Sequence, residues 1–265
     1  NTAMKAHPAD EFFYLVPNHI KFDSEINVLA RLSQSQGDQN GDVAAHRLQI
    51  LSFSRLAWYL LRDTPGFQKQ RLSTTGLTML TRSIVDDLAD QLQLFGGEVN
   101  QPGFATQLAQ SLEELATANI DADDLHQIVE KAIDQEVPGR TWRAKLHDLV
   151  LVDREYEKRL AGRFVGNRQL IDLLVAYLSE PRHAKQVSHM HVYIDQFTRF
   201  TAAEQQIVCA LIEHTAGTTI SLVLDRPYRG SAVPEPNDLF YAVGEQYHEL
   251  VKFARRHPQT VKLLP

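Results

Sequence analysis

Asp195 is the residue whose position most directly indicates chemistry. It follows the apolar run Val192–Ile194, whose β-branched and aromatic residues predict a buried strand. Parallel α/β sheets bind ligands beyond the carboxyl ends of their strands, and in P-loop nucleoside triphosphatases an aspartate at that place holds Mg²⁺. Aspartate is also common in any strand-to-helix turn. Two interpretations therefore stay open: a degenerate Walker B-like aspartate, or a residue that only shapes the turn.

A second group of candidate residues lies where another predicted strand, Arg47–Phe53, passes into a helix. Phe53, Arg55 and Trp58 interleave aromatic and cationic side chains there. Single-stranded nucleic acid is held by this combination, because bases stack on aromatic rings and arginine pairs with phosphate or a guanine edge. The structural alternative is that both aromatic rings belong to the core and Arg55 is an exposed helix charge.

His19 and Lys21 follow a third predicted strand, Glu11–Pro17. If this strand is a parallel neighbour of the strand before Asp195, both polar side chains face the same edge of the sheet. A solvated turn would give the same sequence, so this segment alone does not decide between the two interpretations.

A parallel sheet is needed to bring these residues together. Thr201 and Glu204 form a Thr-x-x-Glu capping box that predicts a helix starting at Thr201. The run Ile220–Leu224 predicts a further strand after that helix. Strand, helix and strand within about one βαβ unit imply a parallel sheet that is buried on both faces.

The middle of the chain has a different pattern. No strand pattern occurs from Ser73 to about Leu178, and apolar residues recur at helical spacing. The predicted helices are Thr75–Leu92, Phe104–Ala118, Asp121–Ile133, Thr141–Leu160 and Asn167–Leu178, followed later by Asp238–Arg256. We therefore predict an α/β fold, a P-loop-NTPase or RecA-like parallel sheet with a large all-helical insertion. Residues 1–61 and 186–265 would form the core, and residues 62–185 the insertion.

Two absences argue against catalysis by this chain alone. The sequence has no Gly-x-x-x-x-Gly-Lys-[Ser/Thr] loop that would cradle phosphates. Gln196 follows Asp195, where a glutamate would normally help to position water. We therefore expect no ATP hydrolysis and assign no catalytic residue.

The histidines give no metal-ligand pattern. His189 and His191 form the only close pair among 11 scattered histidines. Because no acidic or cysteine partner stands near them in sequence, we expect no metal site there.

The bulk properties fit a globular protein of the cytoplasm. The formal charge of -6 argues mildly against coating nucleic acid by charge alone. The single cysteine, Cys209, lies at an apolar helix position and predicts a buried structural thiol in a reducing compartment. No apolar run approaches the 18 or so residues of a membrane span. Asn1–Asp10 has no periodic pattern, and we expect the chain to be a piece of a longer one.

Three motifs occur in an order that resembles one protein family. They are Leu-Val-Pro-x-x-x-x-Phe-x-x-Glu at Leu15–Glu25, Ser-Phe-Ser-Arg-Leu-Ala-Trp at Ser52–Trp58, and Val-Tyr-Ile-Asp-x-Phe-x-x-Phe-Thr-x-x-Glu at Val192–Glu204. Over nearly its whole length the chain is similar to the amino-terminal region of the B subunit of AddAB/RexAB-type helicase–nucleases.

The resemblance implies a role in processing double-strand DNA breaks for recombination. In this family the B subunit pairs with a motor A subunit, resembles a helicase without being the motor, and reads the Chi sequence in single-stranded DNA. The whole complexes use ATP and Mg²⁺, and a nuclease domain, often with an iron–sulphur cluster, follows further along the B subunit. We expect none of these cofactors in this chain. Carried over by motif, the DNA-binding positions are His19, Lys21, Phe53, Arg55, Trp58 and Phe197.

Two residues depart from the family pattern, and two rival functions stay open. His19 and Lys21 replace the glutamine and threonine common in related subunits, which leaves the recognised DNA sequence undetermined. One rival is a truncated P-loop nucleotide-binding domain in which Asp195 holds Mg²⁺. The other is a purely structural subunit that clamps the motor partner.

Overall fold

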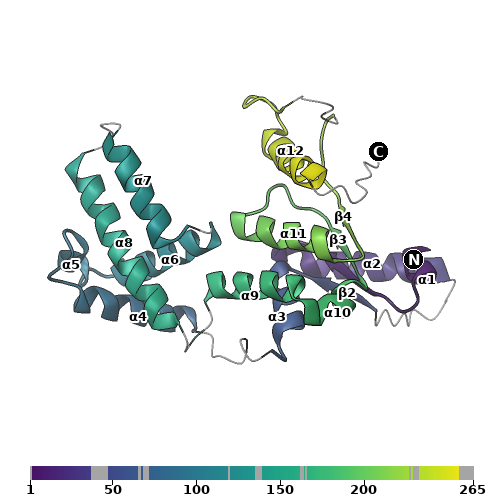
Figure 1. Cartoon of the computed structure of the whole chain (residues 1–265), viewed down its shortest axis with the longest axis horizontal. Helices are drawn as coiled ribbons and strands as arrows, with labels where there is room; N and C mark the ends of the chain where they lie inside the picture. The colour runs from purple at the N-terminus through teal and green to yellow at the C-terminus, as the bar shows by residue number, and fades with distance from the viewer. Residues whose placement is uncertain are drawn as a thin grey trace. The chain divides into compact units, whose positions relative to one another are not determined.

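The computed structural model describes residues 2–36, 47–64, 67, 72–118, 120–134, 139–161, 164, 166–226, 228 and 233–256. The chain divides into two compact units, one of Asn1–Leu61 with Leu174–Pro265 and one of Arg62–Leu173. The sequence predicted a helical insertion of residues 62–185, whereas the second unit of the structure ends at Leu173. Each unit has its own architecture (Figure 1).

A four-stranded parallel sheet of order β2-β1-β3-β4 forms the centre of the first unit. Its strands are β1 Glu11–Leu15, β2 Leu48–Leu51, β3 Met190–Ile194 and β4 Gly217–Ile220. Phe12 and Phe13 point to opposite faces of β1, and both are buried. The sheet is therefore covered on both sides, and the predicted α/β class with three of the predicted strands in one parallel sheet is confirmed.

The last strand lies earlier in the chain than predicted. The sequence predicted Ile220–Leu224, whereas β4 ends at Ile220. Ile220 is in register with Ile194, the last residue of β3, and β4 pairs with β3 alone. Past Ile194 the chain turns at Gln196, which has a φ of 65°, so the run after Ile220 has no neighbouring strand to pair with.

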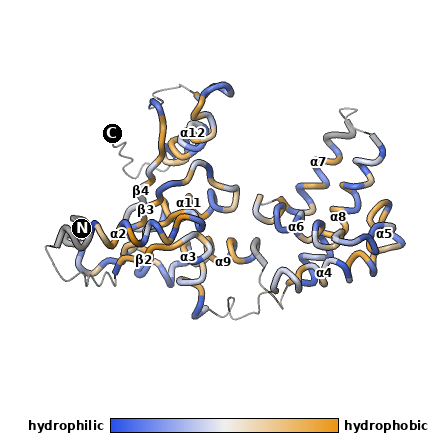
Figure 2. The backbone as a smooth tube through the Cα atoms, turned by 180° about the vertical axis from the view of Figure 1, so that it is seen from behind, coloured by the Kyte–Doolittle hydropathy of each residue, from blue (hydrophilic) through white to orange (hydrophobic). Residues whose placement is uncertain are grey.

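Helices surround the sheet within this unit (Figure 1). They are α1 Thr2–Ala6, the 3-10 turn η1 Asn18–Ile20, α2 Lys21–Gln36, α3 Phe53–Leu61, η2 Pro181–His183, α10 Ala184–Val187, α11 Ala202–His214 and α12 Tyr241–Arg256. The predicted capping box is present, since the Thr201 hydroxyl accepts from the Glu204 amide and the Glu204 carboxylate accepts from the Thr201 amide. In Figure 2, orange, hydrophobic segments lie near β2.

The second unit is helical, as predicted. It contains α4 Thr74–Asp87, α5 Phe95–Glu98, α6 Phe104–Thr117, α7 Ala122–Asp134, α8 Arg140–Leu160 and the first part of α9 Asn167–Ser179. No β-strand occurs among the described residues of this unit. Its core is a cluster contributed mainly by α4, α6 and α8, including Ile84, Leu112 and Tyr156.

None of the helices in the described part of the chain has both the length and the hydrophobicity that a membrane span needs.

Candidate nucleic-acid interface

The carboxyl ends of the strands meet at one edge of the sheet. The amide of Val16, just past β1, donates to the carbonyl oxygen of Leu51 at 3.0 Å. The amide of Asp195, just past β3, donates to the carbonyl oxygen of Leu15 at 3.0 Å. Because the three strands end in step, the segments that follow them all leave the sheet at this edge. The edge therefore collects all three sequence motifs.

Three phenylalanine rings join the second and third motifs. The ring centroid of Phe53 lies 5.2 Å from that of Phe197 and 6.0 Å from that of Phe200. The amide of Phe200 donates to the Gln246 side chain of α12 at 2.8 Å, which fixes the third ring. Phe53 is only 5% exposed. A base could stack on Phe53 only if these rings separated. Direct contact of Phe53 with DNA therefore stays a prediction. In the structure, Phe53 packs against the half-buried ring of Phe197.

Helix α3 presents Arg55 and Trp58 to solvent on one face. The buried face of the helix consists of Phe53, Leu56, Ala57, Leu60 and Leu61. Arg55 and Trp58 are three residues apart, which places them side by side on the helix surface. Trp58 is 46% exposed, and Arg55 is exposed, with no ion pair to any other described residue. The arrangement offers a cation and a stacking ring together.

The two polar residues after β1 lie at the start of the next helix. Pro17 precedes η1, which carries the exposed His19. Lys21 opens α2, and its ammonium group lies 3.1 Å from the Glu25 carboxylate one turn later. Such a half-exposed pair is worth little by itself, so Lys21 keeps its charge available to an anionic ligand.

Asp195 is held by two hydrogen bonds within the fold. The Tyr14 hydroxyl donates to one carboxylate oxygen at 2.5 Å, and the Gln196 amide donates to the other at 2.8 Å. Burial and the bond to Asp195 raise the pKa of Tyr14 to about 12. Among the described residues, Asp195 belongs to no group of histidine, cysteine or acidic side chains that could hold a metal ion. In the structure, the Asp195 carboxylate links Tyr14 of β1 to the turn after β3 through these hydrogen bonds.

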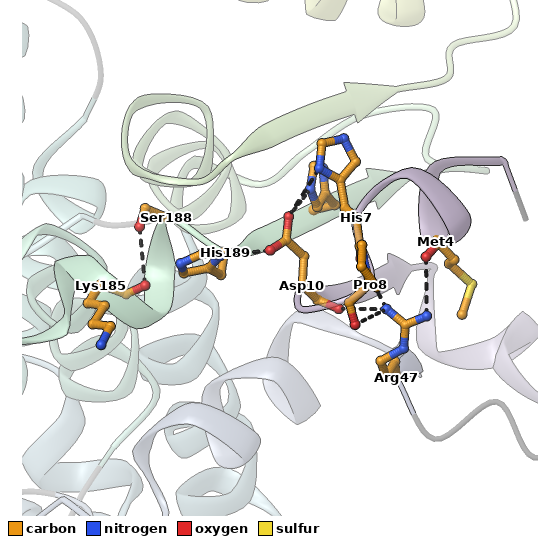
Figure 3. A network of polar contacts seen from close by, with 9 residues as sticks. Met4, His7, Pro8, Asp10, Arg47, Lys185, Ser188 and His189 are labelled. Carbon is orange, nitrogen blue, oxygen red and sulfur yellow. Dashed lines mark hydrogen bonds and ion pairs between the residues drawn. The ribbon is translucent and has the colours of Figure 1, made fainter.

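A polar cluster at the opposite, amino edge of the sheet was missed by the sequence analysis (Figure 3). Asp10 stands just before β1, and its carboxylate oxygens lie 2.7 Å from Nδ1 of His189 and 2.9 Å from Nε2 of His191. His7 Nδ1 lies 3.5 Å from the same carboxylate. The hydrogen bonds to His189 and then His191 keep the pKa of Asp10 below its usual value, against the opposing effect of burial. The strand register pairing Glu11 with Met190 brings these residues together.

The fold and its carboxyl edge define a class of protein. A parallel sheet with an aspartate after β3, an aromatic and basic helix start after β2 and a separate helical unit make this an α/β protein with an additional helical unit. The carboxyl edge is where open α/β sheets bind their ligands.

Comparison with known proteins places the chain more narrowly. The family model described as "ADDB, N-terminal" matches residues 1–263, and the chain belongs to this family. The B subunit of the ATP-dependent helicase/deoxyribonuclease of Limosilactobacillus reuteri (strain DSM 20016) is 49% identical over 271 residues, covering 98% of this chain and 21% of that protein. Proteins of the same name from Lactiplantibacillus plantarum and Enterococcus faecalis are 41% and 35% identical, covering 95% and 93% of this chain. The chain spans about a fifth of the length of these curated relatives.

Proposed function

We propose that this chain is the DNA-binding, non-motor helicase-like part of a helicase–nuclease subunit that processes double-strand DNA breaks for recombinational repair. We further propose that it takes part in recognising Chi in single-stranded DNA. The observation that carries the proposal is the solvent-facing pair Arg55 and Trp58 on α3, at the carboxyl edge of the sheet. The shared family supports it, as does the naming of the relatives as the B subunit of an ATP-dependent helicase/deoxyribonuclease.

Each residue has a defined task in this proposal. A base stacks on the exposed ring of Trp58, while the Arg55 guanidinium pairs with a phosphate or with the N7 and O6 atoms of a guanine. His19 and Lys21 supply hydrogen-bond donors from the neighbouring segment. Phe197 offers a second, half-buried ring that Phe53 supports from below. The formal charge of -6 means that these local groups, rather than the overall charge, must provide affinity.

Chemistry and partners belong to the larger assembly in this proposal. The chain pairs with the motor A subunit in the cytoplasm and acts on DNA as part of a hydrolase. ATP and Mg²⁺ serve the full complex, and an iron–sulphur cluster, where the B subunit has one, lies in its nuclease domain. No residue of this chain is given a catalytic role.

The rival nucleotide-binding function is less well supported. In P-loop nucleoside triphosphatases the Walker B aspartate helps to hold the Mg²⁺ ion that contacts the nucleotide phosphates. Both oxygens of Asp195 accept hydrogen bonds, from Tyr14 and from the amide of Gln196, which favours the interpretation that Asp195 shapes the turn after β3.

Tryptophan fluorescence tests the DNA proposal directly. The sequence has two tryptophans, Trp58 and Trp142, so a Trp142→Phe variant leaves Trp58 as the only reporter. We expect single-stranded DNA to quench this signal saturably, with an affinity that falls as salt rises because phosphate contacts release counterions. An unchanged signal, together with no DNA binding by fluorescence anisotropy, would reject the proposal and favour the structural clamp.

The same sample separates the nucleotide alternative. We expect Mg-ATP to leave the Trp58 signal and the melting temperature unchanged. Saturable stabilisation by Mg-ATP that is lost in Asp195→Asn would support the nucleotide-binding function instead.

A further inference from the structure

The amino edge of the sheet has the composition of a metal site. His7, Asp10 and His191 each present one potential ligand atom, and these atoms lie within 4.8 Å of one another. Asp10 and His191 are mostly buried, with 12% and 15% of their side chains exposed, and the more open His7 faces solvent with 51% exposed. Two imidazoles and one carboxylate are the ligands of many zinc centres, which leave a fourth position for water.

The distances suit a small divalent cation. Bonds of about 2.0–2.2 Å in a tetrahedral zinc site place neighbouring ligand atoms roughly 3.4 Å apart. The Asp10 carboxylate oxygen that faces both rings lies 2.9 Å from His191 Nε2 and 3.5 Å from His7 Nδ1. A small outward shift of the carboxylate from His191 would accommodate the ion between the three groups.

The surroundings already orient these ligands. Nδ1 of His189 lies 2.7 Å from the other carboxylate oxygen of Asp10. In metal sites, a hydrogen-bonding partner at this place orients the carboxylate that binds the metal. Phe12 stacks on the His191 ring at 4.9 Å between centroids and an interplanar angle of 10°. The Arg47 guanidinium donates to main-chain carbonyls on both sides of His7, including those of Met4 and Pro8 (Figure 3). The segment before β1 is therefore fixed by backbone contacts that do not use the ligand atoms.

We propose that His7, Asp10 and His191 form a binding site for a zinc-like divalent cation, with His189 positioning Asp10, and that the ion ties the segment before β1 to β3. The sequence analysis expected no metal here because the histidine pair had no acidic neighbour. Asp10 supplies that acid from a position 179 residues from His189. The site lies at the edge opposite the proposed DNA contacts and depends on none of their residues.

Zinc titration of the metal-free 265-residue chain tests the proposal, with a chromophoric chelator as competitor. We expect one equivalent of Zn²⁺ to bind with micromolar affinity and to raise the melting temperature. His7→Ala should weaken binding at least tenfold and abolish the thermal shift, and His189→Ala should weaken it about tenfold through loss of the outer contact. His126→Ala is the matched control, because His126 is an exposed histidine beside Glu130 in the helical unit; its binding should match that of the unaltered chain.

Cobalt provides an independent readout of the ligands. Bound Co²⁺ should show the intense visible absorption of a tetrahedral site in the unaltered chain and in His126→Ala, but not in His7→Ala or Asp10→Asn. His7→Ala is decisive even if Asp10→Asn fails to fold, since His7 is exposed. Zinc binding that is absent, or that is equal in His7→Ala and the unaltered chain, would overturn the proposal.

Discussion

Trp58 shows at the scale of one residue why α3 is of functional interest. Five apolar side chains of this short helix are buried, yet its largest ring is 46% exposed beside an exposed arginine. A tryptophan is usually mostly buried, and exposed aromatic rings beside cations are the groups that hold unpaired bases. The exposed part of the Trp58 ring beside Arg55 is therefore the feature of α3 that the DNA proposal uses.

The first prediction concerns Arg55 and Trp58 in the full helicase–nuclease complex. A stacked base contributes about 1–3 kcal/mol, and a bidentate arginine–guanine contact contributes about the same. We expect Trp58→Ala or Arg55→Ala to weaken single-stranded DNA binding about 5- to 150-fold and to reduce the Chi response. Unwinding and nuclease activity should be largely retained, because the proposed function assigns the motor and the nuclease to other parts of the complex.

Thermal stability separates recognition from folding in this experiment. Because Arg55 is exposed, Arg55→Ala should lose less than about 1 kcal/mol of unfolding free energy, whereas Trp58→Ala also removes the buried part of its ring and should lose about 1–3 kcal/mol. Trp142→Ala, which changes the half-buried tryptophan of α8, serves as the control and should retain DNA binding. Loss of stability in step with loss of every activity would reject a recognition role for Arg55 and Trp58.

The second prediction is that Asp195 acts through Tyr14 and not through a nucleotide. The chain should hydrolyse no ATP with or without DNA. Asp195→Asn and Tyr14→Phe should each cost about 1.5–3 kcal/mol of stability, the usual cost of losing a hydrogen bond to a charged group. Their double mutant should cost less than the sum, since the two changes remove one interaction. DNA-stimulated turnover that Asp195→Asn abolishes would show this interpretation to be wrong.

At the scale of elements, local patterns predicted most of the helices and strands. The observed α6 and α8 agree with the predicted Phe104–Ala118 and Thr141–Leu160 to within one residue at each end, because helical periodicity and helix breaks are local properties of the sequence. The prediction placed β4 too late in the chain. The residues that form β4 depend on its pairing with β3, which ends at Ile194 opposite Ile220. The short α5 was not predicted, because a buried side chain 53 residues away fixes its start.

That side chain is Asp148, the subject of the third prediction. Its fully buried carboxylate accepts hydrogen bonds of 2.7–2.9 Å from the amides of Gln93, Leu94 and Phe95. Burial alone would raise the pKa of Asp148, but the three amides and His147 outweigh it, so the pKa lies below the usual value. The ionised form is thus favoured in the folded state.

Because the pKa of Asp148 is lowered in the folded state, its contribution to stability depends on pH. The stabilisation by Asp148 is complete above the unfolded pKa of about 4, and it is lost as the pH falls through the lower folded value. We expect Asp148→Asn to cost about 2–4 kcal/mol at pH 7, with the difference from the unaltered chain shrinking below about pH 4. Urea unfolding across pH measures this, with the exposed Asp86→Asn as control. A difference that stays constant down to pH 2 would contradict the assignment.

The fourth prediction concerns an apolar face of α2. Phe22, Ile26 and Leu29 are 71%, 51% and 43% exposed and lie on one side of the helix. Phe22→Gln and Ile26→Gln should each change the unfolding free energy of the chain by less than about 0.5 kcal/mol. Phe12→Ala, at the buried centre of the sheet, should cost about 3–5 kcal/mol. A loss above about 2 kcal/mol in either α2 variant would mean that this face is covered in solution.

At the scale of the whole molecule, the pairing of strands that are far apart in the sequence decides which sites can be predicted from the sequence alone. The carboxyl edge was predictable because each of its three motifs directly follows its own strand, and parallel strands end together. The burial of Phe53 was not, because it depends on rings of Phe197 and Phe200 that arrive from the distant third motif. The histidine cluster was missed for the same reason, since only the pairing of β1 with β3 brings Asp10 to His189 and His191.

The fifth prediction follows from the separate core of the helical unit. Its buried cluster and its polar ties, such as Arg159 to Asp87 at 2.8 Å and Tyr156 to Glu113 at 3.0 Å, are all made between residues of this unit. A segment of this size is long enough to fold alone. We expect residues 62–173, expressed alone, to show a helical circular dichroism spectrum and a cooperative thermal transition.

Core variants test whether the units are independent within the whole chain. Leu112→Ala removes a buried side chain of α6 and should cost about 2–5 kcal/mol, lowering the melting temperature equally in the isolated segment and in one transition of the full chain. Phe13→Ala in β1 should lower only the other transition, because its ring is buried in the sheet unit. A single transition that both variants shift together, or an unfolded isolated segment, would show that the helical unit depends on the sheet for its stability.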